Sequence, residues 1–170
     1  MSEIGTTSGV IHRSSREGEA LWSMGSLMEV KLGPTDSDAG FGVMVVTAPS
    51  GIATPLHVHR NEAEAFYVLQ GSVTYEGGGE LFQLEQGDLI YLPVNVPHRF
   101  RTTGDEPTKF LALMAPAGLS GLYSEVGTPA LERRIPDPPL DADVAAEVAL
   151  WATVAPRYGL ELLGPPLPLV

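Results

Sequence analysis

Between Phe41 and Ala115, hydrophobic and polar residues alternate in short runs that are separated by glycine, proline and asparagine. A period of two residues places successive side chains on opposite faces of a β-strand. Short strands set apart by frequent turn signals are typical of a sandwich or barrel. We therefore expect an all-β domain over roughly residues 35–118. Its strands should cover residues 41–47, 63–70, 72–75, 80–84, 88–92, 98–102 and 109–114.

Three consecutive glycines between Glu76 and Glu80 predict a tight hairpin, because glycine adopts the positive φ that such reversals need. A phosphate-binding loop is the alternative interpretation of a glycine run. That loop requires the pattern Gly-x-x-x-x-Gly-Lys, which the chain lacks. We therefore interpret this segment as a hairpin connection.

The N-terminal region departs from the central pattern. Residues 1–34 mix serine, glycine and charged residues, and then alternate from Leu27 to Leu32. This pattern predicts a loose arm with edge strands. Because free sheet edges tend to be covered, the arm from Ile4 to Leu32 could add strands to its own sheet or to a neighbour. We therefore expect a homodimer, with two-fold symmetry.

The C-terminal extension, residues 119–170, contains an apolar pattern of helical period over about residues 141–155. We expect Asp141 to cap this helix and Pro156 to end it, before a proline-rich tail. The positions that recur at helical spacing are Val144, Val148, Trp151 and Ala155.

The chain carries 21 acidic and 10 basic residues, which gives a formal net charge of −11 at pH 7. This negative field would repel phosphate backbones and anionic lipid headgroups, so we expect no nucleic-acid and no membrane partner. The sequence lacks a long apolar run and the basic and apolar regions of a secretory signal, which predicts a cytoplasmic location. Zero cysteines exclude thiolate ligands, so any metal must accept nitrogen and oxygen.

Three of the four histidines lie within the expected all-β domain, and two of these are close to acidic residues. Strand alternation places His57 and His59 on one face, and it also points Glu64 and His98 inward. So much polar surface facing an apolar interior is costly unless it is coordinated. The pattern therefore predicts a site for one divalent transition metal, which could be Mn, Fe, Co, Ni, Cu or Zn. His12 has no ligand-like neighbour.

Two carboxylates compete for the fourth ligand position. Glu62 lies two residues before Glu64 and shares its face if the strand is already regular there. Inward alternation also assigns Met44, Phe66 and Phe100 to the apolar wall of a substrate pocket.

The spacing of these residues resembles the two signatures of the cupin superfamily. The first is matched by Gly51, His57, His59, Glu64 and Gly71, and the second by Gly87, Pro93, Asn95 and His98. The resemblance implies a double-stranded β-helix, or jelly-roll barrel, here with a C-terminal α-helix. It also implies His57, His59, Glu64 and His98 as metal ligands and favours Glu64 over Glu62.

Two positions depart from this resemblance. Asn95 stands where the superfamily usually has glycine, and asparagine tolerates a left-handed backbone best among the other residues, so the turn should survive. Thr102 stands where asparagine is usual, but it lies beyond the ligand set. We therefore expect neither departure to prevent metal binding.

Within the superfamily, the run from Glu64 to Gly71 is similar to that of quercetin-type flavonol dioxygenases, and residues 121–127 resemble part of their C-terminal extension. This resemblance implies an enolizable substrate whose oxygen binds the metal, with Glu64 as ligand and proton acceptor. The expected function is a metal-dependent dioxygenase acting on a flavonol-like or enolic aromatic small molecule. An O₂-independent isomerase or polyketide-type cyclase, and a non-catalytic binding protein, are the alternatives that the same ligands permit.

Overall fold

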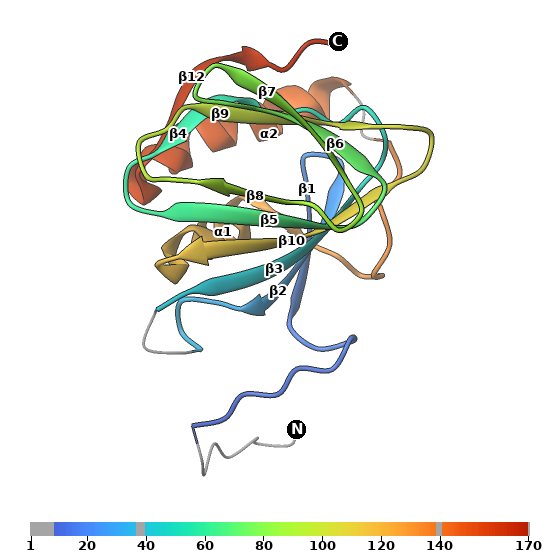
Figure 1. Ribbon diagram of the computed structural model, residues 1–170. Helices are drawn as coiled ribbons and strands as arrows, with labels where there is room; N and C mark the ends of the chain where they lie inside the picture. Colours follow the sequence, from blue (N-terminus) through green and yellow to red (C-terminus); the bar gives the residue numbers. More distant parts are fainter. Residues whose placement is uncertain (1–8, 37–39, 139–140, 170) are drawn as a thin grey trace.

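The computed structural model describes residues 9–36, 40–138 and 141–169, and within these residues two antiparallel sheets face each other (Figure 1). The larger sheet has the strand order β11-β1-β2-β3-β10-β5-β8, and the smaller has the order β12-β4-β9-β6-β7. This arrangement is the all-β jelly roll that the sequence predicts. The strands of the larger sheet are β1 (Glu19–Ser23), β2 (Ser26–Leu32), β3 (Gly42–Ala48), β5 (Ala63–Gln70), β8 (Leu89–Leu92), β10 (Thr108–Ala115) and β11 (Thr128–Pro129). Those of the smaller sheet are β4 (Pro55–His59), β6 (Ser72–Gly77), β7 (Glu80–Glu85), β9 (His98–Thr103) and β12 (Leu160–Pro166).

Alternating burial in the central strands shows why the period-two pattern folds as it does. In β3 and β10 every second residue is buried, and Met44 lies directly opposite Ala112 across the two strands. Phe66 of β5 pairs with Ala112 from the other side. Its ring packs against Phe110, with centroids 5.6 Å apart. The Phe66 ring also packs against Tyr75 of β6 in the opposite sheet, with centroids 5.2 Å apart. Burying each large apolar side chain contributes about 1.5–3 kcal/mol, so this layer holds the two sheets together.

Two predicted turns are confirmed. The β6–β7 hairpin reverses at Gly78 and Gly79, both of which have positive φ. Asn95 also adopts a left-handed backbone, with φ of 68°, and its Oδ1 accepts a hydrogen bond from Arg60 at 3.0 Å. Asparagine therefore replaces glycine in this turn and adds a contact that glycine could not make.

The N-terminal region joins the chain's own larger sheet. β1 and β2 form a hairpin, and β2 pairs with β3, so the two strands extend the sheet away from β10. The two-residue strand β11 pairs with β1 and forms the edge. Residues 1–8 of the expected arm lie outside the described residues.

The C-terminal extension contains the expected helix, α2 (Asp141–Val154), and also α1 (Ser120–Val126), which the pattern did not reveal. The short 3₁₀ helices η1 (Ala117–Leu119) and η2 (Ala155–Tyr158) precede α1 and follow α2. Trp151 and Ala155 are buried as expected, but Val148 is 50% exposed. The side chains of Asp141 and Val144 lie outside the described part.

The expectation of a proline-rich tail is wrong for residues 160–166. These residues form β12, which pairs antiparallel with β4 and covers its free edge. Pro165 and Pro166 lack the N–H that an interior strand needs, and they are tolerated because β12 is itself an edge strand whose pairing is irregular there.

Candidate metal centre

Three strands bring four potential ligands to one end of the barrel interior. His57 and His59 alternate along β4, and His57 is the direct cross-strand partner of His98 at the start of β9. Glu64 comes from β5 in the opposite sheet. The structure therefore brings together the four side chains that the sequence pattern points inward, and they come from both sheets.

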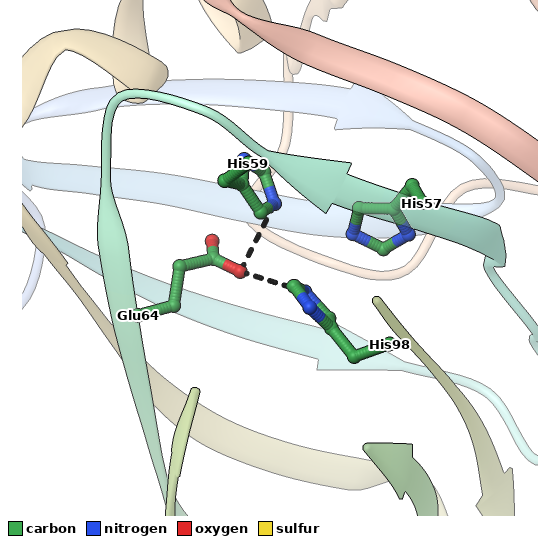
Figure 2. Close-up of side chains that lie close together, drawn as sticks. All are labelled: His57, His59, Glu64 and His98. Atoms are coloured by element: carbon green, nitrogen blue, oxygen red, sulfur yellow. Dashed lines mark hydrogen bonds and ion pairs between the residues drawn. The ribbon is translucent and has the colours of Figure 1, made fainter. Parts of the chain in front are cut away.

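The four ligand atoms lie within 4.8 Å of one another. Glu64 Oε2 is 3.2 Å from His59 Nε2 and 3.2 Å from His98 Nε2, as the dashed lines in Figure 2 show. His57 completes the group, with its ring centroid 4.4 Å from that of His98. The side chains converge on a common point from different directions.

Backbone carbonyls orient two of the imidazoles. His57 Nδ1 donates to the carbonyl of Pro55 at 2.7 Å, and His98 Nδ1 donates to the carbonyl of Val96 at 2.9 Å. A carbonyl only accepts, so Nδ1 of each ring carries a proton and Nε2 is the atom that faces the other cluster residues. His59 Nδ1 is buried and has no hydrogen-bond partner among the described residues.

The electrostatics of the cluster favour a neutral His57 and an ionised Glu64, but a protonated His59. Burial, with the neighbouring histidines, lowers the pKa of His57 to about 3, so its ring is neutral. Burial alone would raise the pKa of Glu64, but the charge of His59 and hydrogen bonds from His59 and His98 outweigh it and hold that pKa well below the ordinary value. Burial likewise opposes protonation of His59, yet the Glu64 carboxylate outweighs it and raises the pKa of His59.

These residues fit a transition metal. Bonds of about 2.0–2.2 Å place neighbouring ligand atoms on one ion about 3 Å apart, which the two 3.2 Å separations approach. Three imidazole nitrogens and one carboxylate oxygen suit divalent ions from Mn to Zn, and the donor set does not select one of them.

Glu62 lies outside this group although it is buried. Its side chain is 4% exposed, and its Oε2 has no hydrogen-bond partner among the described residues. Burial raises the pKa of Glu62 against the opposing effect of His59, and the charge of Glu64 raises it further. The cluster therefore contains Glu64 and excludes Glu62, and His12 is exposed and apart from it.

The cluster opens into a small apolar space, the inner cavity, of about 60 Å³. Its lining includes His57, Glu64 and His98, together with the three residues expected to form a pocket wall. Those residues are Met44, Phe66 and Phe100.

A larger space, the outer chamber, adjoins it and has a volume of about 340 Å³. Its walls include Tyr123 of α1, Trp151 of α2 and Leu162 of β12. The sequence pattern does not reveal this wall, because Trp151 fits the apolar face of the expected helix and the prolines of β12 are typical of a tail. An aromatic residue near the middle of each helix was the signal available.

Residues 43–114 match the family model described as the cupin domain. This region contains all four members of the metal-ligand cluster and the strands that carry them. A buried His/Glu cluster inside a jelly-roll barrel thus lies within the segment that matches the cupin domain, and over residues 43–114 the chain resembles a cupin.

Known proteins of this kind differ in activity. The chain is 28% identical over 115 residues to "Quercetin 2,3-dioxygenase" of Bacillus subtilis, covering 68% of this chain and 34% of that protein. It is 28% identical over 104 residues to "Polyketide synthase CurC" of Streptomyces cyaneus, covering 61% of this chain and 65% of that protein. The chain thus spans less than two thirds of the length of either relative.

Solved structures support the fold. A predicted oxalate decarboxylase from Thermotoga maritima aligns with a TM-score of 0.57 and 22% sequence identity, over 63% of this chain and 99% of that one. At this identity the likeness shows the fold alone. Separately, the described helices are all too short or too polar to cross a membrane.

Proposed function

We propose that this protein is a metal-dependent dioxygenase that acts on a flavonol-like or enolic aromatic small molecule. The observation that carries the proposal is the position of the His/Glu cluster, three of whose four members line an apolar cavity. The similarity to quercetin 2,3-dioxygenase supports it.

The cavity walls favour an aromatic substrate over a phosphorylated one. Neither the inner cavity nor the outer chamber has a lysine or arginine among its described lining residues. A phosphate or a small dicarboxylate would find no lysine or arginine partner there, so only the bound ion would offset its desolvation cost. Apolar side chains such as Phe66, Phe100 and Ile52 suit an uncharged ring instead.

The proposed chemistry divides between a bound ion and the protein. His57, His59, Glu64 and His98 would hold one divalent transition metal, which as a Lewis acid makes an enolic hydroxyl easier to deprotonate. Glu64 is ionised and uses Oε2 toward His59 and His98, which leaves Oε1 as the atom that can accept the substrate's proton. Met44, Phe66 and Phe100 exclude water from that transfer.

Oxygen uptake tests this proposal. Protein reconstituted with Mn, Fe, Co, Ni or Cu is mixed with a panel of flavonols and enolic diketones in an oxygen-electrode cell. We expect substrate-dependent uptake with at least one metal, and its loss in Glu64→Gln and His57→Ala variants. A flat trace with every metal, while ligand binding persists, would contradict the dioxygenase and leave either an O₂-independent enzyme or a non-catalytic binding protein.

An O₂-independent isomerase or polyketide-type cyclase is the second candidate, favoured by the similarity to Polyketide synthase CurC. The same ligands could hold an ion that polarises a carbonyl, with Glu64 moving a proton between carbon and oxygen. Substrate conversion under argon, at a rate equal to that in air, would select this candidate over the dioxygenase.

We also propose that two copies associate through the outer face of β5 and β8. Tyr67 pairs with Leu89 and Ala65 with Tyr91, so these side chains share one face, and Tyr67, Leu89 and Tyr91 are 39–61% exposed. An exposed apolar sheet face next to an edge strand is typical of an interface. Light scattering after gel filtration should give twice the chain mass, and Tyr91→Glu should reduce it to the monomer mass.

A further inference from the structure

The inner cavity and the outer chamber adjoin each other, because they share part of their lining. Met24, Ile52, Thr54, His57 and Tyr123 line both spaces, so they form the junction between them. The inner cavity, at about 60 Å³, has the volume of about two water molecules at roughly 30 Å³ each. An aromatic ligand that reaches the metal cluster must therefore extend through the junction into the outer chamber.

The outer chamber has a size and a lining that suit a ring. Its volume of about 340 Å³ is within the roughly 300–1,000 Å³ of small-molecule sites. Ile52 and Pro55 line one side, while Val148, Trp151 and Leu162 of the C-terminal extension line the other. Val148 and Leu162 are 50% and 40% exposed, which leaves apolar surface available to a ligand.

Hydrogen bonds hold the C-terminal wall in place against the β1–β2 turn. Glu147 of α2 accepts from Ser23 Oγ and from the backbone N–H of Met24, both at 2.6 Å. Trp151 Nε1 donates to the same Ser23 hydroxyl at 3.4 Å. The Glu147 carboxylate is thus already hydrogen-bonded within the protein. These bonds fix α2 as a wall of the chamber.

Tyr123 is the polar side chain without a partner at the junction. Its ring packs edge-on against Trp151, with centroids 5.3 Å apart and an interplanar angle of 71°. Its hydroxyl makes no hydrogen bond with another described residue. Burial, and then the charge of Glu64, raise the pKa of Tyr123, so the phenol keeps its proton and can donate it in a hydrogen bond.

We propose that the outer chamber binds the apolar ring of a two-part aromatic ligand, and that Tyr123 donates a hydrogen bond to a ligand oxygen at the junction. The ligand would carry its oxygen-bearing ring toward the cluster and an uncharged aryl group between Leu162, Val148 and Trp151. This assignment rests on the proposed function for the chemistry at the inner end. It adds two specificity-determining features from outside the cupin domain match.

Binding measurements test the subsite without requiring turnover. The probes are quercetin, a flavonol, and maltol, which has the same hydroxy-ketone group on a single ring. Titrations are run anaerobically by calorimetry on zinc-loaded protein, because zinc has no redox chemistry, and are repeated on chelator-treated protein. An absence of oxygen uptake would then contradict the dioxygenase proposal, but the binding measurements would still test the subsite.

Leu162→Asn removes apolar surface from the chamber, and Leu163→Asn is its matched control. Leu163 is the next residue of β12, is 47% exposed and does not line the chamber. We expect Leu162→Asn to weaken quercetin binding by about tenfold and to change maltol binding less than about twofold. Equal losses for both probes, no loss for either, or the same loss in Leu163→Asn would overturn the subsite.

Tyr123→Phe removes only the phenolic hydroxyl, and Tyr158→Phe, whose hydroxyl donates to Glu125 outside both spaces, is its control. We expect Tyr123→Phe to weaken binding of both probes by about three- to tenfold, since both carry an oxygen near the junction. Zinc stoichiometry and the urea midpoint should stay unchanged. Unaltered affinity for both probes would overturn the assignment of Tyr123.

Discussion

The inner cavity and the outer chamber share a junction, but different parts of the chain form most of their walls. Regular strands form the inner cavity, and all four cluster residues come from the segment that matches the cupin domain. The chamber's outer wall comes from α1, α2 and β12, beyond that segment. Under the proposed function, the barrel would position the metal ligands, while the extension would shape the space that a substrate must fit.

The largest effect should come from removing a histidine of the His/Glu cluster. Replacing His57, His59 or His98 singly by Ala should abolish stoichiometric metal binding. The loss of affinity should exceed the roughly 10–100-fold typical of residues that only support a ligand. Metal content by mass spectrometry after dialysis measures it, and His12→Ala should keep one ion per chain. Full retention in all three variants would refute the centre.

Trp151→Ala should show that the outer wall is also part of the core. Trp151 is 7% exposed and packs within the main hydrophobic cluster, so its truncation should lower the free energy of unfolding by about 3–5 kcal/mol. Urea denaturation measures this, with Leu163→Ala as an exposed control that should change little. A loss below about 1 kcal/mol would mean that the extension only rests on the barrel.

Acid should lower the free energy of unfolding of chelator-treated protein, through titration of the cluster residues. In the unfolded chain His57 protonates near its ordinary pKa of 6.5, whereas in the fold its pKa is about 3. The unfolded state therefore binds more protons between these values, and the free energy of unfolding falls as pH is lowered from 6.5 toward 3. The lowered pKa of Glu64 acts in the same direction below about pH 4.5.

The raised pKa of His59 acts in the opposite sense, since its contribution is present below pH 6.5 and is lost as pH rises through the raised value. Urea midpoints at pH 6.5 and 5 should therefore fall less in His57→Gln than in the parent protein. His12→Gln should fall as much as the parent. Equal slopes in all three proteins would contradict the assignment to His57.

The smallest effect should come from the turn between η2 and β12. Gly159 has φ of 71°, and a Cβ there would meet the side-chain amide of Asn61. Gly159→Ala should therefore cost about 2 kcal/mol or more of stability, from left-handed strain plus that contact. Gly79→Ala has open space around a similar backbone and should cost about 1–2 kcal/mol. Equal costs, by urea denaturation, would show that Asn61 moves freely.

Local signals explain how much of the barrel could be predicted. Alternation in residues 42–48 and 108–115 matches β3 and β10 because one face of each strand is buried. Asn95 could be assigned a left-handed turn from its residue type. The cluster could be predicted because alternation fixes which face a side chain occupies and because the signature spacing selected Glu64.

Contacts between distant segments explain what could not be predicted. β12 contains prolines typical of a loop, and it is a strand only because β4 offers an unpaired edge. Glu62 is buried through close approach of η1, since a Cβ at Gly118 would lie 2.8 Å from its Oε1. Neither arrangement has a local pattern, because each depends on a partner far along the chain.

The sequence by itself determined the all-β barrel, its turns and the residues that face the metal site, because side-chain periodicity and backbone preference are properties of neighbouring residues. Tertiary structure alone decided that Tyr123, Trp151 and Leu162 meet at one chamber beside His57. Their positions follow from the docking of α1, α2 and β12 onto the barrel. Burial of apolar surface and the hydrogen bonds of Glu147 drive that docking, and no short-range pattern encodes it.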